Sequence, residues 1–489
     1  MDSRTPHSES GTLPAVATDP ARPDTPTAGD RAIALLLVLV SATATGILLL
    51  RRYYALGRAG LLITGFVALA LVVFRPRWRR ALGMPTVLVV SVALLVFAPL
   101  RWPKDSTDIW AYAADGRMRS EYGVSSYRHT PSEFPNDRAI RRVKPIWQNT
   151  ESVYGPLWNG ISAGVTSFTG TRRLPTRFAF QSLAALSVFL SVLLVARRTR
   201  EPAAAALIGL NPLVIYSVVN GGHNDALVGL AILAAVLLAS RERLALAGLA
   251  MAVAASVKIV ALLGLAALAV WIWRNRGLRP AAITASIACG GVALGYAFTG
   301  WFDGISPLRE ARLQISHNSI WLLADSEGRT NLFGLGRFYR FSSDYLGSAA
   351  TLSTVVVLAI AAVLVWGRLR DRTPALVVAS ALVAFLLAAT YVLPWYAAWV
   401  LPVLVLEWRS GLTQLMLAQS ALYLIVYQYK QGWPHTVPFR LLFAGNAVIV
   451  FLQLAMTVGL VVMAVRQHRA RGARVDATEH PTAVPARID

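Results

Sequence analysis

The stretch RWPKDSTDIWAYAADGRMRSEYGVSSYRHTP (101–131) interrupts a chain that otherwise consists of apolar runs. A connector rich in acids and bases follows it, and then PIWQNTESVYGPLWNG (145–160). Asp105, Asp108 and Asp115 stand just after an apolar run, where a carboxylate can meet both water and a molecule carried by lipid. Two interpretations fit this pattern: a solvated loop whose acids balance nearby bases, or an active site at a membrane surface.

The apolar runs decide the fold class. The chain has 489 residues, 55% of them hydrophobic, and many runs approach the length that crosses a bilayer. This predicts an all-α polytopic integral membrane protein with about 12–14 transmembrane helices and a catalytic loop on the outer face. The expected spans lie near 32–50, 59–74, 81–100, 177–196, 202–219, 225–240, 242–257, 259–273, 281–300, 347–366, 375–391, 395–407, 411–427 and 440–464.

The domain organisation follows from composition. Residues 1–30 are rich in Pro, Thr, Ser and Asp and are expected to form a disordered cytoplasmic tail. Residues 31–465 form the predicted transmembrane domain, with a catalytic outer loop at 101–176 and a second outer loop at 301–346. The basic segment 466–489 is predicted to be a second disordered cytoplasmic tail. The first apolar run lacks a preceding basic segment and a cleavage site, so it is expected to be an anchor.

The charge of +22 is interpreted as topology and not as nucleic-acid binding. Arginines cluster between apolar runs, as in RPRWRR (75–80) and RRTR (197–200), and alternate connections carry them. The positive-inside rule then places both termini in the cytoplasm and the active site on the outer face of the cytoplasmic membrane. RRYYALGR (51–58) breaks the pattern, so the topology of the first hairpin stays open. The single cysteine, Cys289, excludes an intramolecular disulfide.

Asp108, Tyr112 and Asp115 are spaced at i, i+4 and i+7, on one face of a predicted helix. A carboxylate on that face could act as a general base that takes a proton from an incoming hydroxyl. The alternative for Asp108 is a role as a helix N-cap.

The motif NGGHND (220–225) ends an apolar run with two glycines and several polar side chains. The glycines permit a tight turn, and His223, Asn224 and Asp225 offer hydrogen-bond donors and acceptors at membrane depth. The alternative is an ordinary turn capped by Asn or Asp.

Lys258 interrupts a long apolar segment, where a cation is costly unless it is paired or faces a wet cavity. The phosphate of a lipid carrier would be a suitable partner, and snorkelling to the interface is the alternative. The corner LPWYAAW (393–399) places Trp395 and Tyr396 at the interface, where an aromatic belt would explain them equally well.

Several of these segments, in this order along the chain, resemble the actinobacterial polyprenyl-phosphate-mannose-dependent mannosyltransferases. They are DIWAYAADGRM (108–118), SSYRHTP (125–131), TESVYGPLW (150–158), NPLVIYSVVNGGHND (211–225) and LPWYAAW (393–399). These enzymes have the GT-C architecture, and the resemblance is closest to the alpha-1,6-mannopyranosyltransferases of lipomannan synthesis.

The resemblance implies that Asp108 is the catalytic base. It also implies polyprenyl-phosphate mannose as donor and a lipid-linked glycan as acceptor, with membrane lipids as surroundings. No cofactor and no metal are expected. One departure is Ser125 and Ser126, where the family often has Asn-Pro before the loop tyrosine. The expected donor and acceptor contacts are Tyr112, Asp115, Arg117, Tyr127, Tyr154, His223, Asn224, Asp225, Lys258, His317, Asn318, Trp395 and Tyr396.

Two other functions compete with this hypothesis. A transporter or flippase would also place polar residues at breaks in helices, but it predicts two symmetric halves, and no internal repeat is visible. A transferase that uses polyprenyl-phosphate arabinose would have the same pattern of apolar spans and polar residues at the outer face. The sugar, the acceptor and the linkage formed are not distinguished by the residues themselves.

Overall fold

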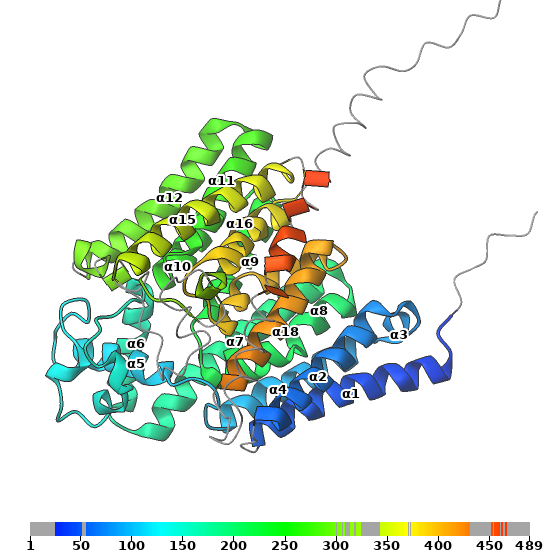
Figure 1. The fold of residues 1–489 in the computed structure, drawn as a ribbon, viewed down its shortest axis with the longest axis horizontal. Helices are drawn as coiled ribbons and strands as arrows, with labels where there is room; N and C mark the ends of the chain where they lie inside the picture. The colour runs from blue at the N-terminus through cyan, green and yellow to red at the C-terminus, as the bar shows by residue number, and fades with distance from the viewer. Residues whose placement is uncertain are drawn as a thin grey trace, which may run out of the picture.

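The computed structural model describes residues 25–50, 55–299, 343–369, 371 and 373–430, with short stretches within 301–323 and 451–466. Every regular element in this part of the chain is a helix (Figure 1). His317, Asn318 and most of the predicted span 440–464 lie outside the described residues.

The first helices form a separate group at one edge of the molecule, drawn in blue in Figure 1. The long helices α1 and α2 pack against each other, and α4 packs against α8 and α7. Their bounds are α1 (Ala28–Leu50), α2 (Ala55–Phe74), α3 (Pro76–Ala81) and α4 (Met84–Phe97), and the turn η1 (Ala98–Leu100) extends α4.

The remaining apolar helices build the body of the molecule. Here α10 packs against both α12 and α9, and α15 packs against α16. The elements are α7 (Arg173–Thr199), α8 (Pro202–Gly209), η5 (Leu213–Val219), α9 (Asp225–Ala239), α10 (Leu244–Val257), α11 (Ala261–Arg276), α12 (Leu278–Ala297), α15 (Ser343–Trp366), α16 (Ala375–Ala388), η8 (Pro394–Trp399), α17 (Leu401–Leu404), η9 (Val405–Glu407) and α18 (Gly411–Lys430).

The predicted spans up to 411–427 each coincide with one of these helices or with a broken pair. Five helices are long and apolar enough to cross a membrane, and the bent pair α8–η5 is a sixth candidate, counted over the described residues. Six further predicted spans are apolar helices of 10–17 residues. The protein is therefore a multi-pass membrane protein, and several of the predicted spans in its described part are shorter apolar helices.

The broken helices have local causes. Asn211 and Pro212 separate α8 from η5, and the two pieces are bent by 40°, because Pro cannot continue the hydrogen-bond ladder of a helix. Pro394 likewise starts the short helix η8 after an extended stretch. Such breaks are tolerated at membrane depth where they are buried in protein or line a cavity. In this protein η5 leads into the motif 220–225, and Trp395 of η8 stacks on His223 of that motif.

The polar stretch 101–160 forms a cap at one end of the body, drawn in cyan in Figure 1. It contains the helices α5 (Asp108–Ser120) and α6 (Pro156–Thr169), which pack against each other. The turns η2 (Pro131–Glu133), η3 (Ile140–Arg142) and η4 (Pro145–Trp147) connect them. Asp108 begins α5, and Arg117 and Arg119 lie in its last turn, so the charges complement the helix dipole.

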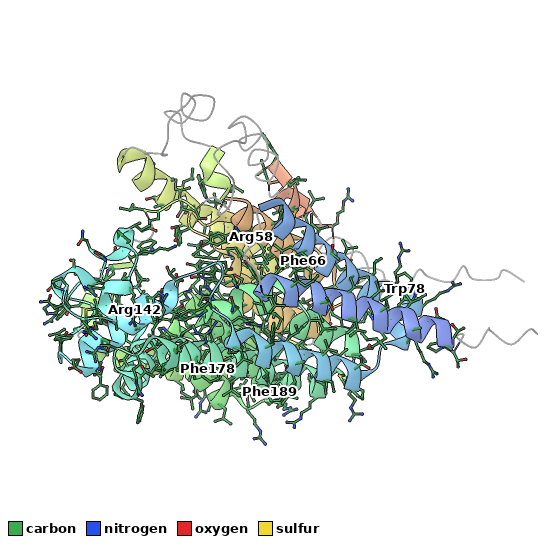
Figure 2. All side chains as sticks on the ribbon, turned by 90° about the horizontal axis from the view of Figure 1, so that it is seen from below. Arg58, Phe66, Trp78, Arg142, Phe178 and Phe189 are labelled. Carbon is green, nitrogen blue, oxygen red and sulfur yellow. The ribbon has the colours of Figure 1, made fainter. Side chains whose placement is uncertain are left out.

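Apolar side chains cover much of the exterior. Leu36 on α1 is 58% exposed and Phe178 on α7 is 46% exposed. Figure 2 shows how side chains such as Phe66, Phe178 and Phe189 stand on the ribbon. Exposed aliphatic and aromatic surface of this extent suits helices that face lipid.

Candidate active site

Asp108 occupies the first position of α5, where its backbone N–H donates to the Ser106 hydroxyl at 3.1 Å. Its side chain keeps 28% exposure, whereas the neighbouring His223 is fully buried. Burial raises the pKa of the Asp108 carboxyl above its ordinary value, and the positive charge of Lys258 opposes that shift. A carboxyl with a raised pKa is a stronger base than an ordinary aspartate.

The turn 220–225 brings His223 to Asp108. Gly222 has a φ of +67°, a left-handed conformation that glycine adopts without strain. The His223 Nδ1 atom lies 3.5 Å from Asp108 Oδ2, longer than an ordinary hydrogen bond. Catalytic hydrogen bonds are often this long before substrate binds. The two segments are more than a hundred residues apart in the sequence.

Asn220 fixes the base of this turn. Its side-chain amide donates to the carbonyl groups of Ala98, Arg101 and Trp102, and its oxygen accepts the backbone N–H of Lys104. The amide therefore ties the turn to the segment that leads into Asp108. The sequence motif contained Asn220, but its structural role depends on a contact that no local pattern indicates.

Several polar atoms of the turn are buried without a hydrogen-bond partner in the described part of the chain. They are both ring nitrogens of His223, both amide atoms of Asn224 and one carboxylate oxygen of Asp225. Burying polar groups unpaired costs free energy, so native proteins rarely cluster them without a reason. The concentration of five such atoms in three consecutive residues indicates a site prepared for a polar ligand.

Lys258 is paired inside the protein. Its Nζ atom donates to Asp225 Oδ1 at 2.7 Å and lies over the rings of Tyr396 and Trp399, 4.4 Å and 5.1 Å from their centroids. The Trp399 indole N–H donates to the same Asp225 oxygen. The sequence suggested a lipid phosphate or the interface as the surroundings of this lysine, whereas the structure pairs it with Asp225, and its other N–H groups remain able to donate.

Aromatic rings form one wall of the site. Trp395 stacks on His223 with 4.0 Å between centroids, and Tyr396 stacks on Trp399 at 4.3 Å. The corner 393–399 supplies three of these four rings, and it therefore lines the turn and does not merely form an interfacial belt. Trp399 was not among the predicted site residues, because its bond to Asp225 is a tertiary contact that no local pattern indicates.

Tyr112 lies one turn after Asp108 and is fully buried. Its ring makes edge contacts with Tyr154, Trp158 and Phe180 at centroid distances of 4.8, 5.0 and 5.5 Å. Gly155, next to Tyr154, lies against α10, where a Cβ atom would collide with the carbonyl oxygen of Ser256. The predicted residues Tyr112 and Tyr154 thus belong to the Asp108 side of the cap.

Asp115 continues the same helix face but lies in a different environment. It is buried and accepts a hydrogen bond from the Ser152 hydroxyl at 2.7 Å. Burial raises the pKa of Asp115 to about 7, although the Ser152 hydrogen bond lowers it. Tyr127 is also buried, and its hydroxyl donates to the Tyr154 carbonyl at 2.7 Å. Both residues therefore support the cap through bonds within it.

Arg117 is the predicted site residue whose bonds are directed away from Asp108. Its guanidinium binds Asp137 at 2.6 Å and Glu121 at 3.0 Å. Asp137 also accepts the backbone N–H groups of Ala139 and Ile140. The sequence could not reveal that Asp137, twenty residues later, is its partner.

The described residues contain no group of three His, Cys, Asp or Glu side chains close enough to hold a metal ion.

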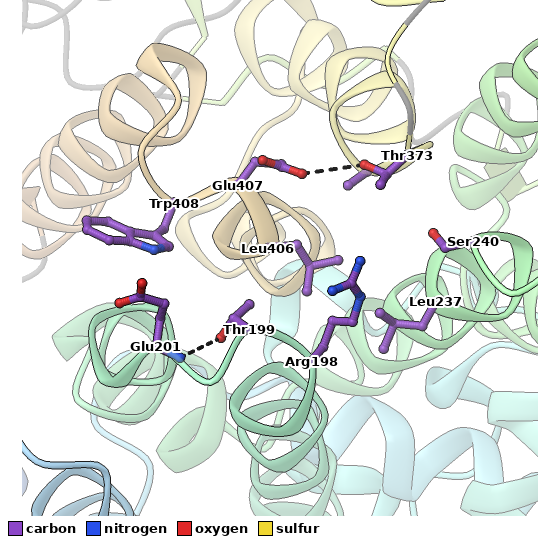
Figure 3. A pocket seen from close by; sticks show the side chains of 10 residues that line it. Arg198, Thr199, Glu201, Leu237, Ser240, Thr373, Leu406, Glu407 and Trp408 are labelled. Carbon is purple, nitrogen blue, oxygen red and sulfur yellow. Dashed lines mark hydrogen bonds between the residues drawn. The ribbon is translucent and has the colours of Figure 1, made fainter.

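A cavity of about 230 Å³ opens at the C-terminal end of α7, between Arg198, Glu201, Ser240 and Glu407 (Figure 3). Arg198, which lines this cavity, lies about 30 Å along α7 from Arg177 near the N-terminal end of the helix. The cavity is thus separate from the Asp108 site.

The fold and the site together define a polytopic all-α membrane protein with an acid-centred polar site beneath a helical cap. Residues 22–275 match the family described as "Alpha-(1->6)-mannopyranosyltransferase, N-terminal domain". The chain belongs to this family, because the match covers more than half of its length.

Curated relatives support this membership. The chain is 27% identical over 336 residues to the alpha-(1->6)-mannopyranosyltransferase A of Mycobacterium tuberculosis, a match that covers 65% of this chain and 64% of that protein. A probable alpha-(1->6)-mannopyranosyltransferase of Mycolicibacterium smegmatis is 25% identical, with 76% and 74% covered. The alpha-(1->6)-mannopyranosyltransferase A of Corynebacterium glutamicum is 30% identical over 38% of each chain. No solved structure matches the chain.

Proposed function

We propose that the chain transfers a mannosyl residue from polyprenyl-phosphate mannose to a hydroxyl of a lipid-linked glycan, at the outer face of the cytoplasmic membrane. The observation that carries this proposal is the Asp108 carboxylate, which is partly exposed and lies 3.5 Å from His223, in a turn that also holds the buried, unbonded amide of Asn224. The names of the relatives supply the sugar.

The reaction needs a base and a means of holding a departing phosphate. In the proposed step Asp108 accepts the proton of the acceptor hydroxyl while the hydroxyl oxygen attacks the anomeric carbon of mannose. The bond from that carbon to the phosphate oxygen breaks, and the phosphate leaves with the electron pair. The raised pKa of Asp108 suits the first event, because burial makes its carboxylate more basic.

The turn provides groups that could hold the donor. Asn224 carries two amide protons without an acceptor in the described chain, and a His223 ring nitrogen is equally unpaired. Lys258 adds a positive charge next to this turn, because its Nζ atom is bonded to Asp225, the residue after Asn224. Donors fixed in advance near a departing anion stabilise it without reorganisation. Trp395 beneath His223 offers an aromatic face of the kind that sugars can stack on.

The test is a donor panel. Membranes that contain the protein would receive polyprenyl-phosphate mannose, polyprenyl-phosphate arabinose and a nucleotide-linked mannose one at a time, and the lipid products would be identified by mass spectrometry. We expect mannosylated glycolipid with the first donor alone. Product formed from the arabinose donor alone, or movement of donor across the bilayer with no transfer, would overturn the proposal.

A further inference from the structure

A second group of charged residues lies on the other side of α5. Trp110 follows Asp108 by two positions, which is roughly 200° around a helix and therefore nearly the opposite face. The Arg142 guanidinium lies over the Trp110 ring, 5.2 Å from its centroid, and Arg173 approaches the same ring at 5.7 Å. Figure 2 labels Arg142 on the cap.

Trp102 joins the group from the segment before α5. Arg173 and Arg177, one turn apart at the start of α7, lie over its ring at 4.5 Å and 4.7 Å. The three guanidinium groups are therefore gathered around two indoles. We call Trp102, Trp110, Arg142, Arg173 and Arg177 the arginine–tryptophan cluster.

No carboxylate of the described chain lies within ion-pair distance of these three arginines. Asp137 contributes to the charge around Arg142, but its side chain is bound by Arg117. Burial and the neighbouring charge of Arg173 lower the pKa of Arg142. Like charges that converge without an acid repel one another, so a bound anion would relieve this repulsion.

The buried part of the cluster also has unused donors. Arg142 donates through Nη2 to the Thr171 carbonyl at 3.0 Å, while its Nη1 is buried without a partner. Arg177 donates through Nη1 to the carbonyl of Pro99 at 3.0 Å, while its Nε is buried without a partner. Guanidinium groups with fixed stems and free N–H groups are suited to phosphate oxygens.

The surroundings of the cluster are apolar and exposed. Leu174 and Phe178 on α7 are 57% and 46% exposed, and Leu100 is 57% exposed. Arg173 is the first residue of a helix long and apolar enough to cross a membrane, so the cluster lies where headgroups meet hydrocarbon. The predicted topology puts it on the outer side, where the positive-inside rule does not account for three arginines.

We propose that the arginine–tryptophan cluster binds the phosphate of a membrane lipid whose hydrocarbon chain lies along Leu174 and Phe178. The site is distinct from the one proposed for the donor, because it lies across α5 from Asp108. The phosphate belongs either to a bilayer glycerophospholipid or to a polyprenyl phosphate, and both present the same phosphate oxygens to the arginines.

The test measures lipid binding and not sugar transfer, so its failure is distinguishable from failure of the proposed reaction. The purified protein in detergent would be titrated with phosphatidylglycerol, polyprenyl phosphate or diacylglycerol, and bound lipid would be counted by native mass spectrometry. Diacylglycerol keeps the chains and lacks the phosphate. The wild type should bind at least one phosphate lipid more tightly than diacylglycerol, and the lipid that binds identifies the source.

The variant is Arg142→Gln/Arg173→Gln, which should weaken binding of that lipid roughly ten- to a hundredfold. Its matched control, Arg138→Gln/Arg141→Gln, removes the same charge from exposed positions of the same cap and should bind as the wild type does. Arg173→Gln alone, at an exposed position, serves if the double variant does not fold. Unchanged binding in the Arg142/Arg173 variant, or an equal loss in the control, would overturn the proposal.

Discussion

The two halves of α5 treat their charged and polar residues differently. In the C-terminal half, Arg117 is matched by Asp137 and Glu121, and Asp137 is further bound by backbone N–H groups. At the N-terminal end, Asp108 faces a buried turn in which the ring nitrogens of His223 and the side-chain amide of Asn224 have no hydrogen-bond partner among the described residues. Complete pairing is what a scaffold requires, whereas unpaired buried groups cost stability and are retained where a ligand completes them.

The largest expected effect is a loss of turnover when the N-terminal end of α5 is changed, with no such loss from the C-terminal half. Asp108→Asn keeps the shape of the side chain and removes its basicity, so turnover should fall about 10²- to 10⁴-fold. Turnover would be measured with purified protein at saturating donor and acceptor. Asp137→Asn is the control from the scaffold half, and per folded molecule it should keep turnover close to the wild type. Near wild-type turnover in Asp108→Asn would show that another group is the base.

The next effect concerns the buried pair of Asp225 and Lys258. Lys258→Met leaves the fully buried Asp225 without its cation, so we expect a loss of stability of about 3–5 kcal/mol, seen as a lower thermal midpoint in detergent. Asp225→Asn/Lys258→Met removes both charges and should recover much of this loss. A Lys258→Met variant as stable as the wild type would mean that the pair does not form.

The double variant Asp225→Asn/Lys258→Met also tests whether Lys258 contacts the donor. If Lys258 also faces the donor phosphate, the stability-recovered double variant should still show a raised Michaelis constant for the donor. A tenfold increase corresponds to about 1.4 kcal/mol. An unchanged constant would assign Lys258 to support of Asp225 alone.

A smaller effect is expected in the scaffold half. Arg117→Gln removes the charge-assisted bonds to Asp137, each worth about 1.5–3 kcal/mol in general, so the thermal midpoint should fall by several degrees. Turnover per folded molecule should stay within about twofold, because the guanidinium does not face Asp108. A loss of turnover as large as that of Asp108→Asn would make Arg117 part of the reaction.

A separate effect, seen only when the pH is varied, is a pH dependence of stability from Asp115. Its pKa of about 7 in the folded protein lies above the ordinary 3.8, so the folded state favours the neutral carboxyl. The stabilisation is complete below about pH 4 and is lost as the pH rises to about 7. Asp115→Asn should gain thermal stability over the wild type across that window and keep the gain above it. Parallel curves for the two proteins would contradict a raised pKa.

Hydropathy was sufficient to place the apolar helices, because burial in lipid and burial in protein both select apolar runs. It did not show the bend between α8 and η5 within the predicted span 202–219, since a break at Pro212 depends on what packs around it. The motif 220–225 and Asp108 were each visible in the sequence. Their contact was not, because it depends on the way Asn220 ties the turn to the segment before α5.

Charged residues were the hardest to interpret from the sequence. The sequence suggested substrate contacts for Arg117 and Lys258, and the structure bonds them to Asp137 and Asp225. The arginine–tryptophan cluster draws on three separate segments, so no local pattern indicates it. Periodicity identifies the face of a helix on which a charge lies, but pairing is decided by tertiary structure.

The most direct test of the central claim is an experimental structure of the protein with polyprenyl-phosphate mannose bound in a lipid nanodisc. We expect the mannosyl group beside Asp108, with its phosphate within hydrogen-bond distance of His223 or Asn224. Donor density beside Arg117, or in the cavity between Arg198 and Glu407, with none at Asp108, would contradict it.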